Sequence, residues 1–257
     1  MRRAGWLTAL AVFLLAAVSR TPVAAQSASP EIDGDFEGRI DYAFYTENSN
    51  TLRNLIAYAT AAIDKNGDSP ALQYQLAYAH FRRAGLQAEK EPSAASGELS
   101  KCADALDRAT KTAPDFAEAY ALQSMCLGRL AALRSFSAMI NGPLSNSRLT
   151  RARELAPQNP RVVLADALGD YWKPRAFGGN KAVAVTKLRA AIELFERDDE
   201  APGRPRWGLA DAWMTLGLHF RNEDDTLAAR SALERALLVA PEYAAARRLL
   251  AKITHPR

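Results

Sequence analysis

The chain has 257 residues, of which 48% are apolar and 24% are charged, a balance that is typical of a folded globular protein. This composition excludes a mainly disordered chain and a polytopic membrane protein, and two cysteines exclude a small disulfide-rich scaffold. Long stretches rich in alanine and leucine lie between prolines and glycines, and this pattern predicts an all-α fold.

The first segment has the pattern of a secretory signal peptide. Met1-Arg2-Arg3 is basic, Ala4 to Val18 is apolar or small apart from Thr8, and small residues end at Ala25. The apolar run is short for a membrane-spanning helix, which needs roughly 20 residues. We therefore expect a signal peptide over residues 1–25 that is cleaved after Ala25, and a periplasmic or secreted protein. An uncleaved anchor and a buried helix are the alternatives.

Charge gives no reason to expect a nucleic-acid partner. The whole chain has 33 basic and 29 acidic residues. The signal segment carries three of the arginines and no acid, so 30 basic residues against 29 acidic ones remain after cleavage. Nucleic-acid binding depends on clustered lysine and arginine, which a nearly neutral chain does not supply. No second stretch is long and apolar enough to cross a membrane.

After a flexible lead-in over residues 26–34, residues 35–257 form a single predicted helical domain. Residues 35–66 contain two helical patterns, which we interpret as a degenerate first unit ended by Asn66 to Pro70. Helix pairs follow, separated by Pro114, Pro157 and the segment 197–203. In the middle pair, the first helix is expected to continue past Leu133 to a break at Gly142-Pro143.

The C-terminal unit, residues 210–243, carries the clearest motif. It reads Trp213-x2-Leu216-Gly217-x2-Phe220, Ala229-x3-Leu233-x2-Ala236 and Pro241. Large residues at i, i+3 and i+7 share one helix face, Gly217 and Ala229 allow two helices to approach closely, and Pro241 ends the second helix. The pattern resembles the tetratricopeptide repeat (TPR). Residues 242–254 are expected to form a capping helix.

The resemblance implies a right-handed α-solenoid of stacked antiparallel helix pairs, in which the first helices line a concave groove for a protein or peptide. The expected groove residues lie on these first helices, away from their packed faces. Aromatic and arginine side chains among them are suitable interface anchors, although Tyr74, Tyr78 and Met125 can equally be core residues. The full set is Tyr74, Tyr78, Arg82, Met125, Arg129, Asp166, Asp170, Asp211, Met214, Leu218, Arg221 and Asn222.

The two cysteines are predicted to form a disulfide. Cys102 lies twelve residues before Pro114 and Cys126 twelve residues after it, so two antiparallel helices that meet at this proline place them at the same level. An exported protein enters an oxidising compartment. Two buried free thiols are the alternative.

No residue set points to catalysis, a metal or a cofactor. His80, His219 and His255 stand alone in the sequence, without the neighbouring ligands of a metal motif. Gly178-Gly179-Asn180 lacks the ending of a phosphate-binding loop, so we interpret it as a turn in which Asn180 caps the next helix. The acid pair Asp224-Asp225 is interpreted in the same way, as a helix cap. We therefore predict a non-enzymatic adaptor.

Two other functions are alternatives to the adaptor. The glycine-glycine turn is similar to one in the extracytoplasmic T-component of TRAP transporters. A transport-associated protein of that kind would handle a small ligand or dock on a solute-binding protein, and it would require a closed hydrophobic pocket. An α-helical hydrolase is the third possibility, and no residue set supports it.

Overall fold

The computed structural model describes residues 35–254, except residue 134 and residues 199–203. The predicted signal peptide and lead-in lie outside these residues, as does His255. The described part contains eleven α-helices and one 3-10 turn, and no strand. The helices are α1 (Phe36–Tyr45), α2 (Ser49–Asn66), α3 (Pro70–Gln87), α4 (Pro92–Thr112), α5 (Ala117–Leu133), α6 (Ser135–Leu155), α7 (Pro160–Trp172), α8 (Lys181–Phe195), α9 (Leu209–Asn222), α10 (Thr226–Val239) and α11 (Ala244–Thr254).

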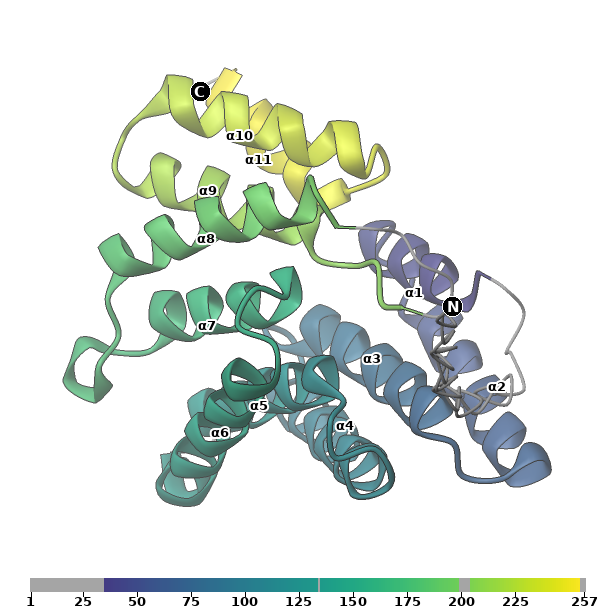
Figure 1. The fold of residues 1–257 in the computed structure, drawn as a ribbon. Helices are drawn as coiled ribbons and strands as arrows, with labels where there is room; N and C mark the ends of the chain where they lie inside the picture. Colours follow the sequence, from purple (N-terminus) through teal and green to yellow (C-terminus); the bar gives the residue numbers. More distant parts are fainter. Residues whose placement is uncertain (1–34, 134, 199–203, 255–257) are drawn as a thin grey trace, which may run out of the picture.

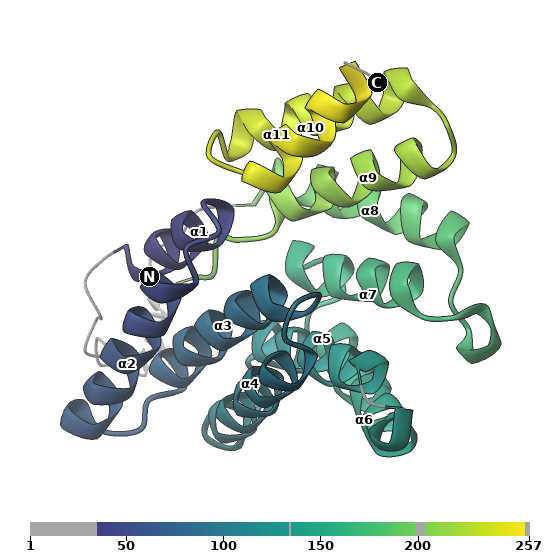
Figure 2. The ribbon, with the colours of Figure 1, turned by 180° about the vertical axis from the view of Figure 1, so that it is seen from behind.

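The helices pack as consecutive antiparallel pairs, which confirms the predicted all-α, TPR-like architecture. The pairs are α1 with α2, α3 with α4, α5 with α6, α7 with α8, and α9 with α10, and α11 packs on α10. Figures 1 and 2 show these pairs following one another around a curve. Most of the buried apolar residues from α1 to α9 belong to one continuous cluster, so the stacked pairs share a core.

The C-terminal unit packs as its motif predicts. Leu216 is buried, and Trp213 and Phe220 are partly buried against the core. A Cβ atom added to Gly217 would lie 2.7 Å from Cγ of Leu233 on α10. Only glycine therefore allows α9 and α10 to lie this close.

Side-chain caps fix the starts of several helices. Asn180 accepts hydrogen bonds from the backbone N–H groups of Ala182 and Val183, which confirms the turn interpretation of the glycine-glycine segment. Asp225 accepts one from Ala228 at 3.0 Å and caps α10 as expected. Such caps satisfy N–H groups that have no partner inside the helix.

The middle pair departs from the prediction. Helix α5 ends at Leu133 and α6 begins at Ser135, and Pro143 lies inside α6 rather than between the two helices. The sequence places the break at Gly142-Pro143 because proline removes a helix hydrogen bond. Here the packing of α6 on α5 outweighs that local cost.

The two ends of the array contact each other. The rings of Tyr45, at the end of α1, and Tyr243, just before α11, lie 4.4 Å apart between centroids. Glu47 accepts hydrogen bonds from Arg248 on α11. We call the contacts of residues 44–47 with residues 243–248 the seam. The first and last units are therefore neighbours in space.

Residues 204–208, which immediately precede α9 and which we call the connecting segment, pack against α1 and α3. Trp207 is buried, stacks on Tyr78 with ring centroids 5.2 Å apart, and donates from Nε1 to the Tyr74 hydroxyl at 2.9 Å. Its backbone N–H donates to Glu37 at 3.0 Å. Burial raises the pKa of the Glu37 carboxyl to about 7, even though the backbone hydrogen bonds lower it. Gly208, with φ of 124°, leads the segment into α9.

A disulfide joins Cys102 on α4 to Cys126 on α5 in this structure, with the two Cα atoms 6.3 Å apart. Both side chains are fully buried. Because α4 and α5 belong to successive pairs, the bridge links two units rather than the two helices of one unit.

Mature protein that is denatured without reductant is expected to show no reactive thiols, and the same sample after reduction is expected to show two per chain. Reduction should also lower the free energy of unfolding by about 3 kcal/mol, since the closed loop restricts the unfolded chain. Thiol titration and urea denaturation measure the two effects, and the Cys102→Ala, Cys126→Ala double variant serves as the thiol-free control. Two thiols before reduction would contradict the bridge.

Candidate functional site

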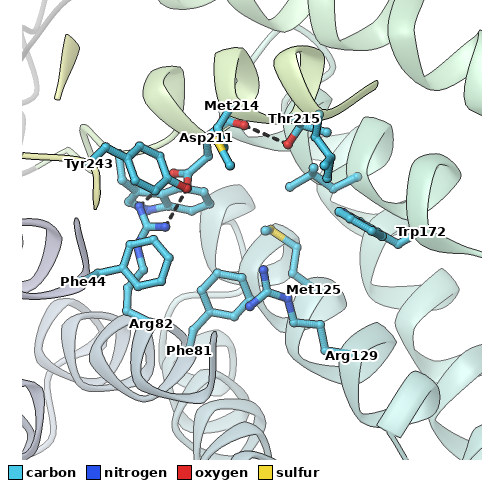
Figure 3. Close-up of a pocket in the computed structure, with 13 residues that line it drawn as sticks. Phe44, Phe81, Arg82, Met125, Arg129, Trp172, Asp211, Met214, Thr215 and Tyr243 are labelled. Atoms are coloured by element: carbon cyan, nitrogen blue, oxygen red, sulfur yellow. Dashed lines mark hydrogen bonds and ion pairs between the residues drawn. The ribbon is translucent and has the colours of Figure 1, made fainter. Parts of the chain in front are cut away.

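The first helices of the pairs surround one pocket of about 190 Å³. Helices α1, α3, α5, α7 and α9 all contribute to its lining, together with the connecting segment and the residue just before α11 (Figure 3). This is the inner side of the stacked pairs, where a TPR-like array is expected to bind. The lining residues are Phe44, Phe81, Arg82, Met125, Arg129, Leu168, Trp172, Trp207, Asp211, Met214, Thr215, Leu218 and Tyr243.

One wall of the pocket is a buried ion cluster centred on Arg82. The Arg82 guanidinium donates two hydrogen bonds to Asp211, one to each carboxylate oxygen, both at 2.8 Å. It also donates to Asp41 at 2.8 Å and to the Tyr78 hydroxyl at 2.7 Å, and the Phe44 ring lies 4.4 Å from its central carbon. The cluster therefore joins α1, α3 and α9.

Burial and neighbouring charges shift the pKa values of the groups in this cluster. Burial raises the pKa of the Asp41 carboxyl, while Arg82 and the Tyr78 hydroxyl favour the ionised form. The pKa of Arg82 is raised well above its ordinary value, since Asp211, Tyr78 and Asp41 outweigh the opposing effect of burial. Arg82 is consequently a permanent cation, and its donors are occupied by protein acceptors.

Arg129, on α5, differs from Arg82 although both line the pocket. Its guanidinium lies over the face of Phe81, 4.1 Å from the ring centroid, as Figure 3 shows. Solvent reaches its side chain, and no carboxylate of the described residues lies within ion-pair distance of it. The walls of the pocket remove part of the water around its guanidinium, which lowers the pKa of Arg129 to about 10, with a further contribution from the charge of Arg82, so it remains a cation at neutral pH.

The opposite wall of the pocket is apolar. Met125 on α5 and Met214 and Leu218 on α9 are partly buried, and Trp172, at the end of α7, is 61% exposed. Methionine side chains adapt to irregular partners because they are flexible and polarizable. The pocket thus combines an accessible cation with a deformable apolar surface.

Six of the twelve predicted groove residues come together in this pocket. They lie on α3, α5 and α9, and they are Arg82, Met125, Arg129, Asp211, Met214 and Leu218. Their meeting follows from the stacking of first helices, which brings residues far apart in sequence to one inner surface.

Two predicted groove residues require correction. Tyr74 is 3% exposed and Tyr78 is 1% exposed, so both are core residues rather than groove residues. Each hydroxyl has a protein partner, since Tyr74 accepts from Trp207 and Tyr78 donates to Asp41. The connecting segment covers the face of α3 that the sequence analysis assigned to the groove.

The remaining four predicted residues lie elsewhere. Asp166 and Asp170 on α7 both form ion pairs with Lys187 on α8, at 2.9 and 2.6 Å. Arg221 and Asn222 are exposed at the end of α9 and hydrogen-bond to each other. None of the four lines the pocket.

Sequence reasoning missed the residues that approach the pocket from the ends of the array. Phe44, Trp207 and Tyr243 lie at a helix end, in a connecting segment and in a turn. The one usable signal was Trp207, because a large aromatic residue in a connection between helices needs a partner to be buried.

His80 and His219 each contact another side chain of the protein. His80 is buried, and its Nδ1 lies 2.5 Å from the Glu98 carboxylate. His219 contacts the ring of Tyr171 edge-on. Across the residues with assigned positions there is no cluster of three or more side chains of the kinds that hold a metal ion. Within that same part of the chain, no helix is both long and apolar enough to cross a bilayer.

Stacked antiparallel helix pairs whose first helices enclose a shared inner pocket define a TPR-like helical scaffold. No family model matches the chain, and no curated protein matches it. Among solved structures, the chain is similar to the C-terminal part of a TPR repeat-containing protein from Cytophaga hutchinsonii. The alignment covers 84% of this chain and 99% of the other, with 15% identity and a TM-score of 0.34.

Proposed function

We propose that this protein is an exported, non-enzymatic scaffold that binds a segment of a partner protein at its inner pocket. The observation that carries this proposal is the convergence of five first helices on one pocket with an apolar wall and an accessible arginine. A preformed pocket on a rigid scaffold binds with a small ordering cost.

The polar groups of the pocket favour binding over catalysis. Both oxygens of Asp211 accept hydrogen bonds from Arg82, so this carboxylate is not poised to take a proton from a substrate. The Thr215 hydroxyl donates to a backbone carbonyl one helical turn earlier, at 2.8 Å, so it is not hydrogen-bonded to a side-chain base within the described residues, as an activated nucleophile would be. Export to the periplasm or beyond rests on the signal pattern of residues 1–25.

Site-specific photo-crosslinking in cells tests this function. A photoreactive amino acid at Trp172, on the rim of the pocket, is expected to capture a partner protein. The same amino acid at Leu238 on α10, which is 80% exposed and does not line the pocket, is the matched control and should not capture it. Combining the photoreactive residue at Trp172 with Leu218→Arg should abolish capture, because the longer side chain fills the pocket.

Two results would contradict the proposed function. One is capture of the same proteins from Trp172 and Leu238, and the other is capture that persists with Leu218→Arg. Circular dichroism of the Leu218→Arg variant must show native helix content, so that lost capture reports the pocket rather than unfolding.

The pocket is also the feature that favours the second candidate, a transport-associated component with a small ligand. That candidate requires a closed hydrophobic site, and the apolar side chains of Met125, Met214 and Leu218 would supply part of such a lining. Native mass spectrometry of protein purified from its source tests this second candidate, which predicts a retained small molecule and no partner captured at Trp172.

A further inference from the structure

Arg129 is the arginine of the pocket that has no carboxylate partner among the described residues. Three arginines with buried or half-buried side chains each pair with a carboxylate: Arg82 with Asp211, Arg83 with Glu98 and Arg161 with Asp198. Arg129 is exposed at the pocket and has only the face of Phe81 as a partner among the described residues. Water hydrates its exposed guanidinium, and a group that displaces this water has to replace the hydrogen bonds.

The nearby acid does not neutralise Arg129. The charge of Asp211 raises the pKa of Arg129, but both oxygens of that carboxylate already accept hydrogen bonds from Arg82. Among the described residues, no acceptor is therefore hydrogen-bonded to the donors of Arg129, which line the pocket. A ligand that enters the pocket and displaces water from Arg129 must supply one, and an anion with two oxygens fits the planar guanidinium best.

The size and lining of the pocket define the rest of the ligand. Its volume of about 190 Å³ is somewhat larger than a cavity of about 150 Å³ that holds benzene. Met125 lies one helical turn before Arg129 on α5, and Met214 and Leu218 line the same pocket from α9. A compact apolar body of roughly benzene size, bearing one acid group, matches these dimensions.

We propose that the pocket binds a compact organic carboxylate, with the acid group on Arg129 and the apolar body against Met125, Met214 and Leu218. A free small acid and the C-terminal residue of a peptide share this chemistry. The inference rests on the proposed function in that it assigns the same pocket, and it adds the charge and size of the group that enters.

Isothermal titration calorimetry with matched probes tests the assignment. Phenylacetate is expected to bind, and phenylacetamide, which has the same shape but no charge, is expected to bind at least tenfold more weakly, since a hydrogen bond to a charged group is worth about 1.5–3 kcal/mol. Arg129→Met should reduce phenylacetate binding to the level of the amide. Arg221→Met, a change at an exposed arginine outside the pocket, should leave binding unchanged.

A second pair of probes separates the two sources of the carboxylate. Acetyl-Ala-Ala-Phe with a free C-terminus should bind more tightly than phenylacetate if the pocket takes the end of a chain, and more weakly if it takes a free acid. Equal binding of acid and amide, unchanged binding by Arg129→Met, or no binding of either acid would overturn the inference. Partner capture at Trp172 that survives Arg129→Met would exclude the partner's C-terminus as the source of the carboxylate, while leaving the proposed function intact.

Discussion

Replacing Arg82 with methionine is expected to lower the free energy of unfolding by about 3–5 kcal/mol, the cost of removing one partner from a buried ion pair. The change leaves Asp41 and Asp211 facing each other in the interior without a cation. It also removes the hydrogen bonds that join α1 and α3 to α9. Urea denaturation followed by circular dichroism measures the loss.

Two further variants make this test specific. Arg221→Met, at an exposed position, should change stability by no more than about 0.5 kcal/mol. Combining Arg82→Met with Asp41→Asn and Asp211→Asn should recover part of the loss, because the uncompensated charges are gone. A loss below about 1 kcal/mol for Arg82→Met would show that the cluster does not hold the units together.

Replacing Trp207 with alanine is expected to cost about 3–5 kcal/mol, as for other buried aromatic residues. Trp207 fills the space against Tyr78 and satisfies the Tyr74 hydroxyl. Trp207→Phe keeps an aromatic ring and should cost less, about 1–3 kcal/mol, the penalty for leaving a buried polar group unpaired. Thermal or urea unfolding monitored by tryptophan fluorescence gives both values.

The matched control for Trp207 is Trp172, which is 61% exposed. Trp172→Ala should leave stability within about 0.5 kcal/mol of the parent protein. Equal losses of stability at the two positions would mean that Trp207 does not fix the connecting segment to α3.

The helix pairs could be predicted from the sequence because their determinants are local. Gly217 and Leu233 report a close contact between adjacent helices, and Asn180 and Asp225 mark helix starts within three residues of the group they cap. The face that each first helix turns inward follows from its apolar spacing, which is why six of the expected residues meet in the pocket.

The seam and the placement of Tyr74 and Tyr78 could not be predicted in this way. Both depend on the curvature of the array, which is the sum of small rotations at every interface between pairs. No spacing within one unit records that sum. Trp207 contacts Tyr74 and Tyr78, which lie more than 120 residues earlier in the sequence. Pro143, inside α6, shows that tertiary packing can override a helix breaker.

The seam has a consequence for how the molecule opens. In a linear repeat array, a terminal unit has one neighbour and frays at the expense of a single interface. Here the outermost helices are held from both sides, through Tyr45 with Tyr243 and Glu47 with Arg248. Amide hydrogens in α1 and α11 should therefore exchange with deuterium slowly, at the rate set by global unfolding. All the helix pairs should unfold together in one step.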